Sequence, residues 1–487
     1  MSLRRVDARF LLPRRPRTAA VLGDLAGWRE GLAQAGVELV SAGDRRVPDL
    51  AVAPGTLARS ALASGAQMML LEGRARRSVA GSSWSMQRLL VRPSLEQPSL
   101  LLPLDDAGAS RYAVEHWSLV DRRWKVARMI VARELMRTRL FPQLPTCVTV
   151  SVRTPGLPFI VASAVRRLGL PPTVRPLLTL GLGDVLSRNI FHLFPAEGTE
   201  PAWVLKFARV PDYTEPFDRD ARGLALAARA GGSVAAHAPR LLVRFDDAGI
   251  HANVETAAVG YRLRDLLLRP GRRHEKLRLI DRVAEWILQM ARATAVHSSG
   301  SAILEQRRLV DEAIERGAID REMRDLAADL PPLPAVLQHN DLGSWNVIVD
   351  DDHFTVLDWE LARARGLPLW DLFYFLTDAL ALLDGSIGGE RRHVHTIELF
   401  RGRRDSSRIL FEWTRRAVDD LKVPAEAVGA IATLCWLHHA LTPLRRRDAM
   451  NVFARGGVQA VHGTERVADA WLAEPELGVA WTRWRER

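Results

Sequence analysis

Three oxygen-bearing side chains stand next to short apolar runs in the C-terminal half of this chain. Asp341 and Asn346 lie in a loop that follows the run 336–338, and Asp358 ends the run 355–357. An acidic turn at 350–352 reverses the chain between them, so we expect the three side chains to meet at one rim of strand ends. A carboxylate there can orient a hydroxyl group and accept its proton, while carboxylate and amide oxygens hold Mg²⁺ against nucleotide phosphates. The pattern predicts phosphoryl-transfer chemistry, whereas acidic turns alone are common in hairpins.

This motif resembles the catalytic loop of the aminoglycoside phosphotransferase and choline kinase-like family, which reads His-x-Asp-x-x-x-x-Asn and precedes a strand that ends in Asp. His339, Asp341 and Asn346 match the loop in spacing, and Leu-Asp-Trp-Glu at 357–360 matches the strand. The resemblance implies that Asp341 is the catalytic base, that Asn346 and Asp358 bind magnesium, and that His339 braces the loop. It also implies that Asp371 hydrogen-bonds the catalytic loop from a helix start, although Asp at such a position is equally typical of an N-cap.

Lys206 is the candidate contact for nucleotide phosphates. It interrupts the apolar strand-like run 203–208, and burial of an unpaired ammonium is costly, so we expect an anionic partner. The resemblance implies contact with the α- and β-phosphates of ATP and a pairing with an acid on the next helix. The family has Glu at that place and this chain has Asp220, with Asp218 and Glu215 as alternatives.

Two further segments are candidates for the ATP site. The loop with Gly181, Gly183 and Ser187 lies between two strand-like runs, and its glycines allow close backbone approach to phosphates. A plain hairpin turn fits it equally well. The segment with Glu255 and Ala257 resembles the hinge that binds adenine through backbone groups, and an ordinary strand with Glu255 exposed is the alternative.

The elements that must position these residues form a β-rich lobe and a helical lobe. Strand-like runs at 176–180, 188–194 and 203–208 precede a helix-like run at 217–230, and mostly helical sequence follows residue 281. Consecutive prolines at 171–172 mark a boundary. We therefore expect an α/β domain at 1–170, a kinase-like N-lobe at 171–260 and a C-lobe at 261–487, with the catalytic loop at 339–346 and the metal strand at 355–360.

The first 170 residues alternate apolar runs with helix-like stretches, as at 18–22, 37–40, 49–53 and 68–71. That alternation predicts βαβ units with a parallel sheet, a trimmed Rossmann-like fold. The first strand is not followed by the glycine fingerprint of a dinucleotide site, so no cofactor is assigned to this domain.

Composition limits the partners. The chain has 487 residues, a net charge of +11 and 47% hydrophobic residues, a balance typical of a globular protein. The arginines are spread along the chain without interleaved aromatic residues, so we expect no specific nucleic-acid partner. No apolar run is long enough to span a bilayer, and we expect a cytoplasmic protein. Cys147 and Cys435 are the only cysteines, and we expect both to be buried. The sequence does not indicate an oligomeric state.

The resemblance and the residues together predict a bilobal, protein kinase-like small-molecule kinase that uses ATP and Mg²⁺. Its acceptor is a hydroxyl group of a small metabolite or antibiotic-like molecule. Two alternatives stay open: a nucleotide-binding pseudokinase that regulates a partner, and a methyltransferase or sugar-transfer protein with a kinase-like domain. Asp220 in place of Glu favours the first, and the N-terminal βα pattern favours the second.

Overall fold

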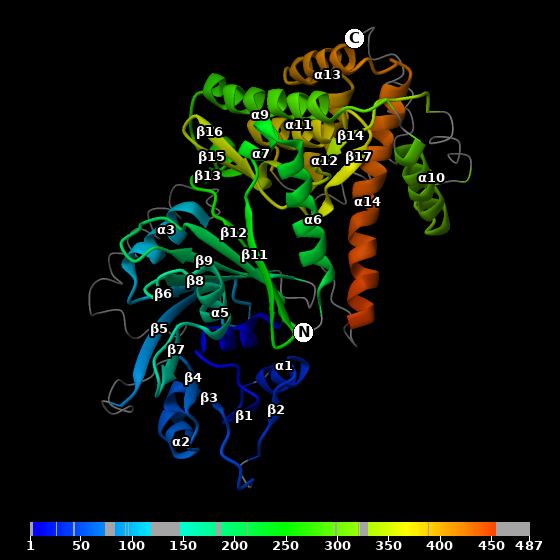
Figure 1. Cartoon of the computed structure of the whole chain (residues 1–487). Coiled ribbons are helices and arrows are strands. Elements are labelled where there is room, and N and C mark those ends of the chain that lie inside the picture. Colours follow the sequence, from blue (N-terminus) through cyan, green and yellow to red (C-terminus); the bar gives the residue numbers. More distant parts are fainter. Residues whose placement is uncertain are drawn as a thin grey trace. The chain divides into compact units, whose positions relative to one another are not determined.

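The computed structural model describes residues 3–453 apart from 26, 42–43, 74–82, 93, 96, 118–146, 182–186, 212, 298–299, 320, 322–329 and 388. The chain divides into two compact units. The first unit contains residues 1–217, 240–259 and 453–458, and the second contains 218–239, 260–452 and 459–487. Figure 1 labels the elements of both units.

The first unit is built on one twelve-stranded sheet with the order β11-β12-β10-β9-β8-β6-β5-β7-β4-β3-β1-β2. At one end β1, β2, β3 and β4 pair in parallel, as the alternating pattern predicts. From β4 onward the strands pair antiparallel, beginning with β4 and β7. A Rossmann-like fold for the N-terminal domain is therefore not confirmed. The elements up to residue 168 are η1 (Leu3–Leu11), β1 (Thr18–Val21), α1 (Trp28–Gln34), β2 (Glu38–Leu39), β3 (Leu50–Pro54), η2 (Gly55–Leu57), α2 (Ala58–Ala63), β4 (Met68–Glu72), β5 (Ser85–Arg92), β6 (Leu100–Pro103), α3 (Ala107–Trp117), β7 (Cys147–Val152) and α5 (Phe159–Leu168).

The three strands predicted for the β-rich lobe at 176–180, 188–194 and 203–208 are confirmed as β8 (Arg175–Leu180), β9 (Asn189–Phe194) and β10 (Trp203–Phe207). Two further strands of this lobe are β11 (Leu241–Asp247) and β12 (Ile250–Thr256). β6 pairs with β8, so these strands continue the N-terminal sheet. One apolar core also runs from Val6 and Trp28 to Phe207 and Val254. The predicted boundary at residue 170 therefore lies inside the first unit, and the three predicted domains at 1–170, 171–260 and 261–487 stay a prediction.

A buried ion-pair network links η1 to the chain around Arg209 and Asn189 within the first unit. The Arg209 side chain is fully buried, and its Nε donates to Asp7 Oδ2 over 2.6 Å while its Nη2 donates to Asn189 Oδ1 over 3.1 Å. Arg9 donates to the Arg209 carbonyl oxygen over 2.6 Å. Each buried charge thus has an opposite charge and hydrogen bonds, as burial of ionised groups requires.

The second unit is mostly helical. Its elements are most of α6 (Glu215–Ala230), α7 (Gly232–Ala236), β13 (Tyr261–Arg262), α8 (Leu263–Leu268), α9 (Arg273–Thr294), α10 (Gly300–Glu315), β14 (Val336–Gln338), η5 (Ser344–Asn346), β15 (Val347–Asp350), β16 (His353–Val356), η6 (Trp359–Leu361), β17 (Arg363–Gly366), α11 (Trp370–Leu383), α12 (Gly389–Phe400), α13 (Ser407–Leu421) and α14 (Ala427–Phe453). β15 pairs with β13 and β16, and β14 pairs with β17. α11 packs against α9, α12 and α13.

α11 is the central helix of this unit. It is mostly apolar, and every residue from Trp370 to Leu382 is buried, as expected of a helix surrounded by protein. Asp371, Tyr374 and Asp378 are spaced i, i+3 and i+7, so they share one face of the helix. That face meets the catalytic loop.

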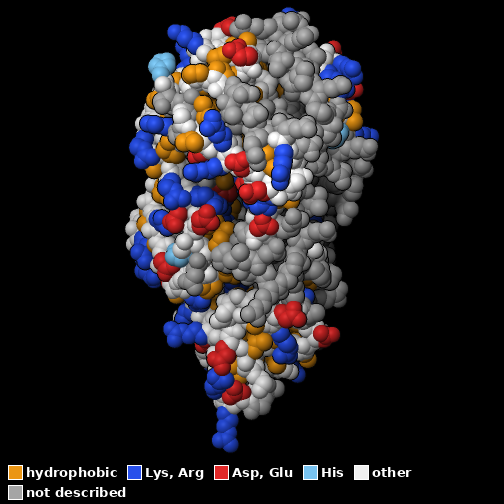
Figure 2. Space-filling model, turned by 90° about the vertical axis from the view of Figure 1, so that its right-hand side faces the viewer, with side chains coloured by type: hydrophobic (Ala, Val, Ile, Leu, Met, Phe, Trp, Pro, Cys, Tyr) orange, Lys and Arg blue, Asp and Glu red, His pale blue; other side chains and the backbone are white. Residues whose placement is uncertain are grey.

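Basic and acidic side chains are mixed on the surface. Figure 2 shows them interspersed over the described part of one face. Several arginines pair with nearby carboxylates, as Arg408 does with Glu412 and Arg316 with Asp448. None of the helices within the described ranges is long and apolar enough to cross a membrane.

Candidate active site

The catalytic loop is held between β14 and the β15–β16 hairpin. β14 ends at Gln338 and delivers His339, η5 carries Asn346, and β16 leads into Asp358. The Leu357 N–H donates to the Asn346 carbonyl oxygen over 2.7 Å and so joins the end of the second strand to the loop. The residues predicted from their spacing therefore lie in one neighbourhood of the second unit.

His339 braces this neighbourhood as a neutral ring. It is fully buried, its Nε2–H donates to the Leu357 carbonyl oxygen over 2.9 Å, and its Nδ1 accepts the Asp341 backbone N–H over 3.3 Å. One ring nitrogen is thus a donor and the other an acceptor, which is the pattern of an uncharged imidazole. Burial lowers its pKa to about 4, so the ring stays uncharged at neutral pH.

Asp341 is oriented by two neighbours. The Asn346 side-chain amide donates to the Asp341 carbonyl oxygen over 2.8 Å and to Oδ2 over 3.1 Å, and the Tyr374 hydroxyl donates to Oδ1 over 3.3 Å. Burial and the negative charges of Asp358 and Glu360 raise its pKa well above the usual value, although the bonds from Asn346 and Tyr374 oppose the shift. A carboxylate with a raised pKa is suited to accept a proton.

The same residues fit a divalent cation. Because its amide nitrogen faces Asp341, Asn346 keeps its amide oxygen for a metal ion. The backbone of Asp358 is in the left-handed region, with φ 65°. Its negative charge raises the pKa of Asp341 and opposes the lowering of the His339 pKa. Carboxylate and amide oxygens are the ligands that Mg²⁺ prefers, so Asn346 and Asp358 would suit this ion.

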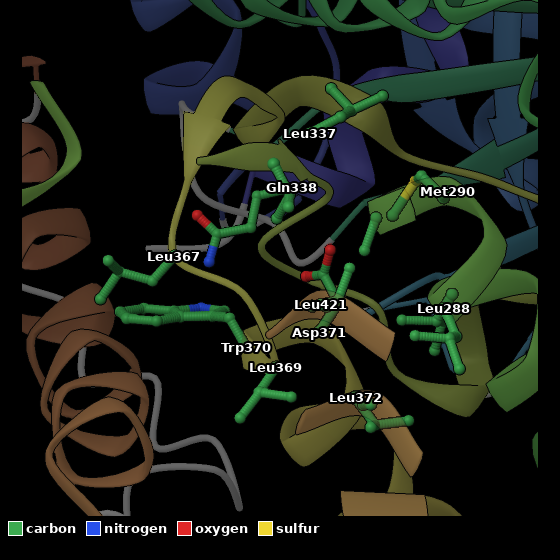
Figure 3. Close-up of a pocket in the computed structure, with 14 residues that line it drawn as sticks. Leu288, Met290, Leu337, Gln338, Leu367, Leu369, Trp370, Asp371, Leu372 and Leu421 are labelled. Carbon is green, nitrogen blue, oxygen red and sulfur yellow. The ribbon is translucent and has the colours of Figure 1, made fainter. Parts of the chain in front are cut away.

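Asp371 lies in the first turn of α11 and holds the loop backbone. Its Oδ2 accepts the His339 N–H over 2.6 Å and its Oδ1 accepts the Asn340 N–H over 2.9 Å. Burial raises its pKa to about 6, and the two backbone bonds oppose that shift. Figure 3 shows its carboxylate and the Gln338 amide among apolar side chains such as Leu367 and Leu369.

Sequence reasoning missed Asp378, which holds the other end of the loop. Its carboxylate accepts the Ser344 backbone N–H over 2.8 Å, and it also bonds the Ser344 hydroxyl and the Arg392 guanidinium. Arg392 belongs to α12. Its charge is engaged by Asp378, so it is not free to bind a substrate anion. The i, i+3, i+7 spacing on α11 is the signal that could have identified Asp378 and Tyr374.

Gly223 was also missed as a packing residue. A Cβ atom at this position of α6 would lie 1.9 Å from the carbonyl oxygen of Trp359, the residue after Asp358. Only glycine permits such close approach of a helix to the backbone of the metal strand. Asp220, the candidate helix acid, is fully buried on the same helix. Its pairing with Lys206 stays a prediction.

In the first unit, Lys206 has an anionic partner, as its place in an apolar strand predicts. Its Nζ lies 2.9 Å from Glu255 Oε1, and both residues are buried. β10 and β12 are antiparallel neighbours in which Lys206 lies opposite Asn253, so Glu255 is the diagonal neighbour two residues along. Glu255 is therefore not exposed, as the alternative of an ordinary strand would require, and its carboxylate pairs with the Lys206 ammonium group.

The remaining candidates border the same strands. Gly181 cannot carry a side chain, because a Cβ atom would lie 2.5 Å from the Arg188 carbonyl oxygen, and Ser187 is buried beside it. Gly183 lies outside the described residues. The Ala257 N–H donates to the Ala202 carbonyl oxygen over 3.0 Å, so this N–H is already used within the first unit, and the hinge role of Ala257 stays a prediction.

Known proteins resemble the C-terminal part of the chain. The model of a phosphotransferase enzyme family matches residues 182–393. A solved glucosamine kinase in complex with glucosamine, ADP and inorganic phosphate is 14% identical, with 62% of this chain and 83% of that chain covered and a TM-score of 0.36. Aminoglycoside phosphotransferase APH(3'')-Id from Streptomyces rimosus is 15% identical, with 57% and 96% covered and a TM-score of 0.34. No curated protein matches the chain. The resemblance read from the catalytic loop is confirmed by the match of residues 182–393 to the phosphotransferase enzyme family model.

Proposed function

We propose that this chain is a small-molecule kinase that transfers the γ-phosphoryl group of ATP to a hydroxyl group of its acceptor. The observation that carries the proposal is the environment of Asp341. Its carboxylate is oriented by Asn346 and Tyr374, has a raised pKa, and lies within the electrostatic reach of Asp358. Family membership of residues 182–393 supports the same reaction class.

In this proposal Asp341 positions the acceptor hydroxyl and takes its proton as the oxygen bonds to the γ-phosphorus. The bond from that phosphorus to the β,γ-bridging oxygen breaks, and ADP leaves with the electron pair. Asn346 and Asp358 would hold Mg²⁺, which neutralises charge on the phosphate oxygens when bound. His339 and Asp371 keep the loop backbone fixed, so that little reorganisation is needed as the proton moves.

The nucleotide residues come from the strands of the first unit. Lys206 is proposed to contact the α- and β-phosphates, with Glu255 fixing its ammonium group in the absence of nucleotide. Gly181 and Ser187 border the proposed phosphate loop, and the carbonyl group of Ala257 is proposed to accept from adenine. A helix carboxylate, Asp220, stays the proposed second partner of Lys206.

A melting experiment tests the nucleotide and metal parts of the proposal. We expect ATP with Mg²⁺ to raise the melting temperature of the native chain, since a ligand at 100 times its Kd stabilises by about 2.7 kcal/mol. The Asp358→Asn variant should lose most of this shift. Asp350→Asn, which alters an exposed carboxylate on the same hairpin, is the matched control and should keep it. Equal shifts in all three proteins would remove Asp358 as a metal ligand.

Turnover separates an enzyme from a pseudokinase. ADP release should occur with an acceptor from a panel of amino sugars, aminoglycosides and amino alcohols. The Asp341→Asn variant should bind ATP but lose turnover by at least about a hundredfold, the usual size of a general-base contribution. Release of ADP at the native rate by that variant would refute the role of Asp341, and nucleotide binding without turnover on any acceptor would favour the pseudokinase alternative.

A further inference from the structure

The second unit contains a cleft that the proposed reaction does not use. It lies between α7, α9, α13 and the β15–β16 turn, and its volume is about 420 Å³. Figure 1 labels these elements. Pockets for small ligands have volumes of roughly 300–1,000 Å³, so the cleft is large enough for a small molecule.

Aromatic rings form the base of the cleft. Trp286 and Phe354 are almost fully buried and meet edge to face with centroids 5.8 Å apart. The His237 ring stacks on Phe354 at 4.1 Å, and its Nδ1–H donates to the Phe354 carbonyl oxygen. The Trp286 indole N–H donates to the Ser233 carbonyl oxygen over 3.2 Å. The rings are therefore fixed and their donors are used, so polar recognition must come from the charged groups around them.

The charged groups leave carboxylates uncompensated. Three acids and two arginines line the cleft. The Arg416 guanidinium pairs with Glu285 and lies over the Trp413 ring. Arg282 donates to the Asp351 carbonyl oxygen over 3.0 Å, and burial lowers the pKa of His237, so that ring adds no positive charge at neutral pH.

Two acids carry the excess negative charge. Asp281 accepts a hydrogen bond from the neutral Trp413 indole over 2.9 Å and has no cationic partner among the described residues. Asp352 is exposed at the β15–β16 turn and has no hydrogen-bond or ion-pair partner within the described part of the chain. A cation entering the cleft would thus meet two carboxylates that have no cationic partner among the described residues, and the three acids of the lining outnumber its two arginines.

We propose that this cleft binds a small organic amine, in which a protonated nitrogen is carried on an aromatic or apolar body. The ammonium group would pair with Asp281 and Asp352, and the apolar body would fill the cleft whose base the Trp286, Phe354 and Trp413 rings form. This site differs from the catalytic loop and does not depend on the proposed kinase activity.

The cleft is close enough to the metal strand to influence it. Phe354 belongs to β16, which leads into Asp358, and Trp286 packs edge to face on Trp359 with centroids 6.4 Å apart. The Trp359 ring in turn packs against His339 at 4.8 Å. Two aromatic rings, Trp286 and Trp359, therefore connect an occupant to the catalytic loop, a suitable arrangement for a regulatory ligand.

Binding is tested on the full chain without nucleotide, with 5-fluorotryptophan in place of tryptophan and ¹⁹F resonances as the signal. Trp286→Phe and Trp413→Phe variants assign the two cleft resonances. Phenethylamine is the probe, and phenylacetate and 2-phenylethanol are anionic and neutral molecules of similar size. We expect phenethylamine to shift both resonances saturably. The other two should bind a few-fold more weakly, up to about fivefold, because neither carries a positive charge that pairs with a carboxylate at a partly exposed site.

Charge variants locate the binding. Asp352→Asn breaks no hydrogen bond among the described residues, so it should fold normally and still weaken phenethylamine binding several-fold, and Asp281→Asn should do the same. Asp419→Asn, an exposed acid on α13 that does not line the cleft, should bind like the native chain, as should Asp341→Asn. The proposal is overturned if the shift does not saturate, if phenylacetate or 2-phenylethanol binds as tightly, or if Asp352→Asn and Asp281→Asn leave the affinity unchanged.

Discussion

Replacement of Asp371 by Asn separates the role of its charge from that of its shape. In the native chain both carboxylate oxygens accept buried backbone N–H groups of the catalytic loop, from His339 and Asn340. An asparagine keeps one acceptor and presents an NH₂ group to the other N–H. A hydrogen bond to a charged group contributes about 1.5–3 kcal/mol, so loss of one that holds the catalytic geometry should lower kcat by roughly ten- to a hundredfold.

Loss of a hydrogen-bonded carboxylate would ordinarily destabilise a protein. At neutral pH, however, Asp371→Asn should raise the free energy of unfolding. Burial raises the Asp371 pKa from 3.8 to about 6, and each pKa unit corresponds to 1.36 kcal/mol, so the ionised form costs the folded state about 3 kcal/mol. A raised carboxyl pKa means that the folded state binds more protons than the unfolded state between these values. Native stability from this group is thus complete below about pH 4 and is lost as pH rises through 6. Asparagine has no such dependence.

Urea unfolding at several pH values measures this difference. We expect the free energy of unfolding of the native chain, minus that of Asp371→Asn, to fall by about 1 kcal/mol between pH 5 and pH 7.5, the part of the transition that lies in this window. Asp419→Asn, on the exposed surface, should show no such change. A difference that stays constant with pH, or a variant with native kcat, would refute the reasoning about Asp371.

Three other substitutions test the positioning of the site. Gly223→Ala should destabilise the chain by several kcal/mol and lower its melting temperature, because the added methyl group would overlap the Trp359 carbonyl oxygen. Lys206→Met should weaken ATP binding and lower the free energy of unfolding by about 3–5 kcal/mol, because it removes the cation that pairs with the buried Glu255 carboxylate. Adding Glu255→Gln should restore stability in urea unfolding but should not restore ATP binding. Tyr374→Phe removes a bond that stabilises the ionised catalytic carboxylate, so the acid limb of the pH–rate profile should move to higher pH; an unmoved limb would contradict this.

The catalytic loop could be predicted because its information is local. His339, Asp341 and Asn346 are fixed by spacing within eight residues, and short, mostly apolar runs lie on either side of the loop. The parallel strands β1 to β4 were predictable for the same reason, because βα alternation is written in consecutive residues. Local periodicity was enough for each of these elements.

Long-range pairing was not predictable in the same way. The sequence did not reveal β5 and β7, which insert antiparallel between β4 and β6 and join the N-terminal strands to the β-rich lobe. It also did not show that Glu255 meets Lys206, because that contact depends on the register between β10 and β12. Register follows from packing and loop geometry, which neighbouring residues along one strand do not encode.

The backbone at the site is strained at residues where local sequence and tertiary packing act together. Asn340, Asp358 and Leu369 all have left-handed φ angles, at 69°, 65° and 66°. Asn and Asp tolerate this region, whereas leucine rarely does, so the conformation of Leu369 must be imposed by its surroundings. Its side chain is buried beside Trp370 in the apolar cavity of Figure 3, and the next turn of the chain places Asp371 under the loop. Burial of a leucine contributes about 1.5–3 kcal/mol, enough to offset a strain of about 1–3 kcal/mol. The apolar core of the second unit thereby holds the backbone conformation from which Asp371 reaches the catalytic loop.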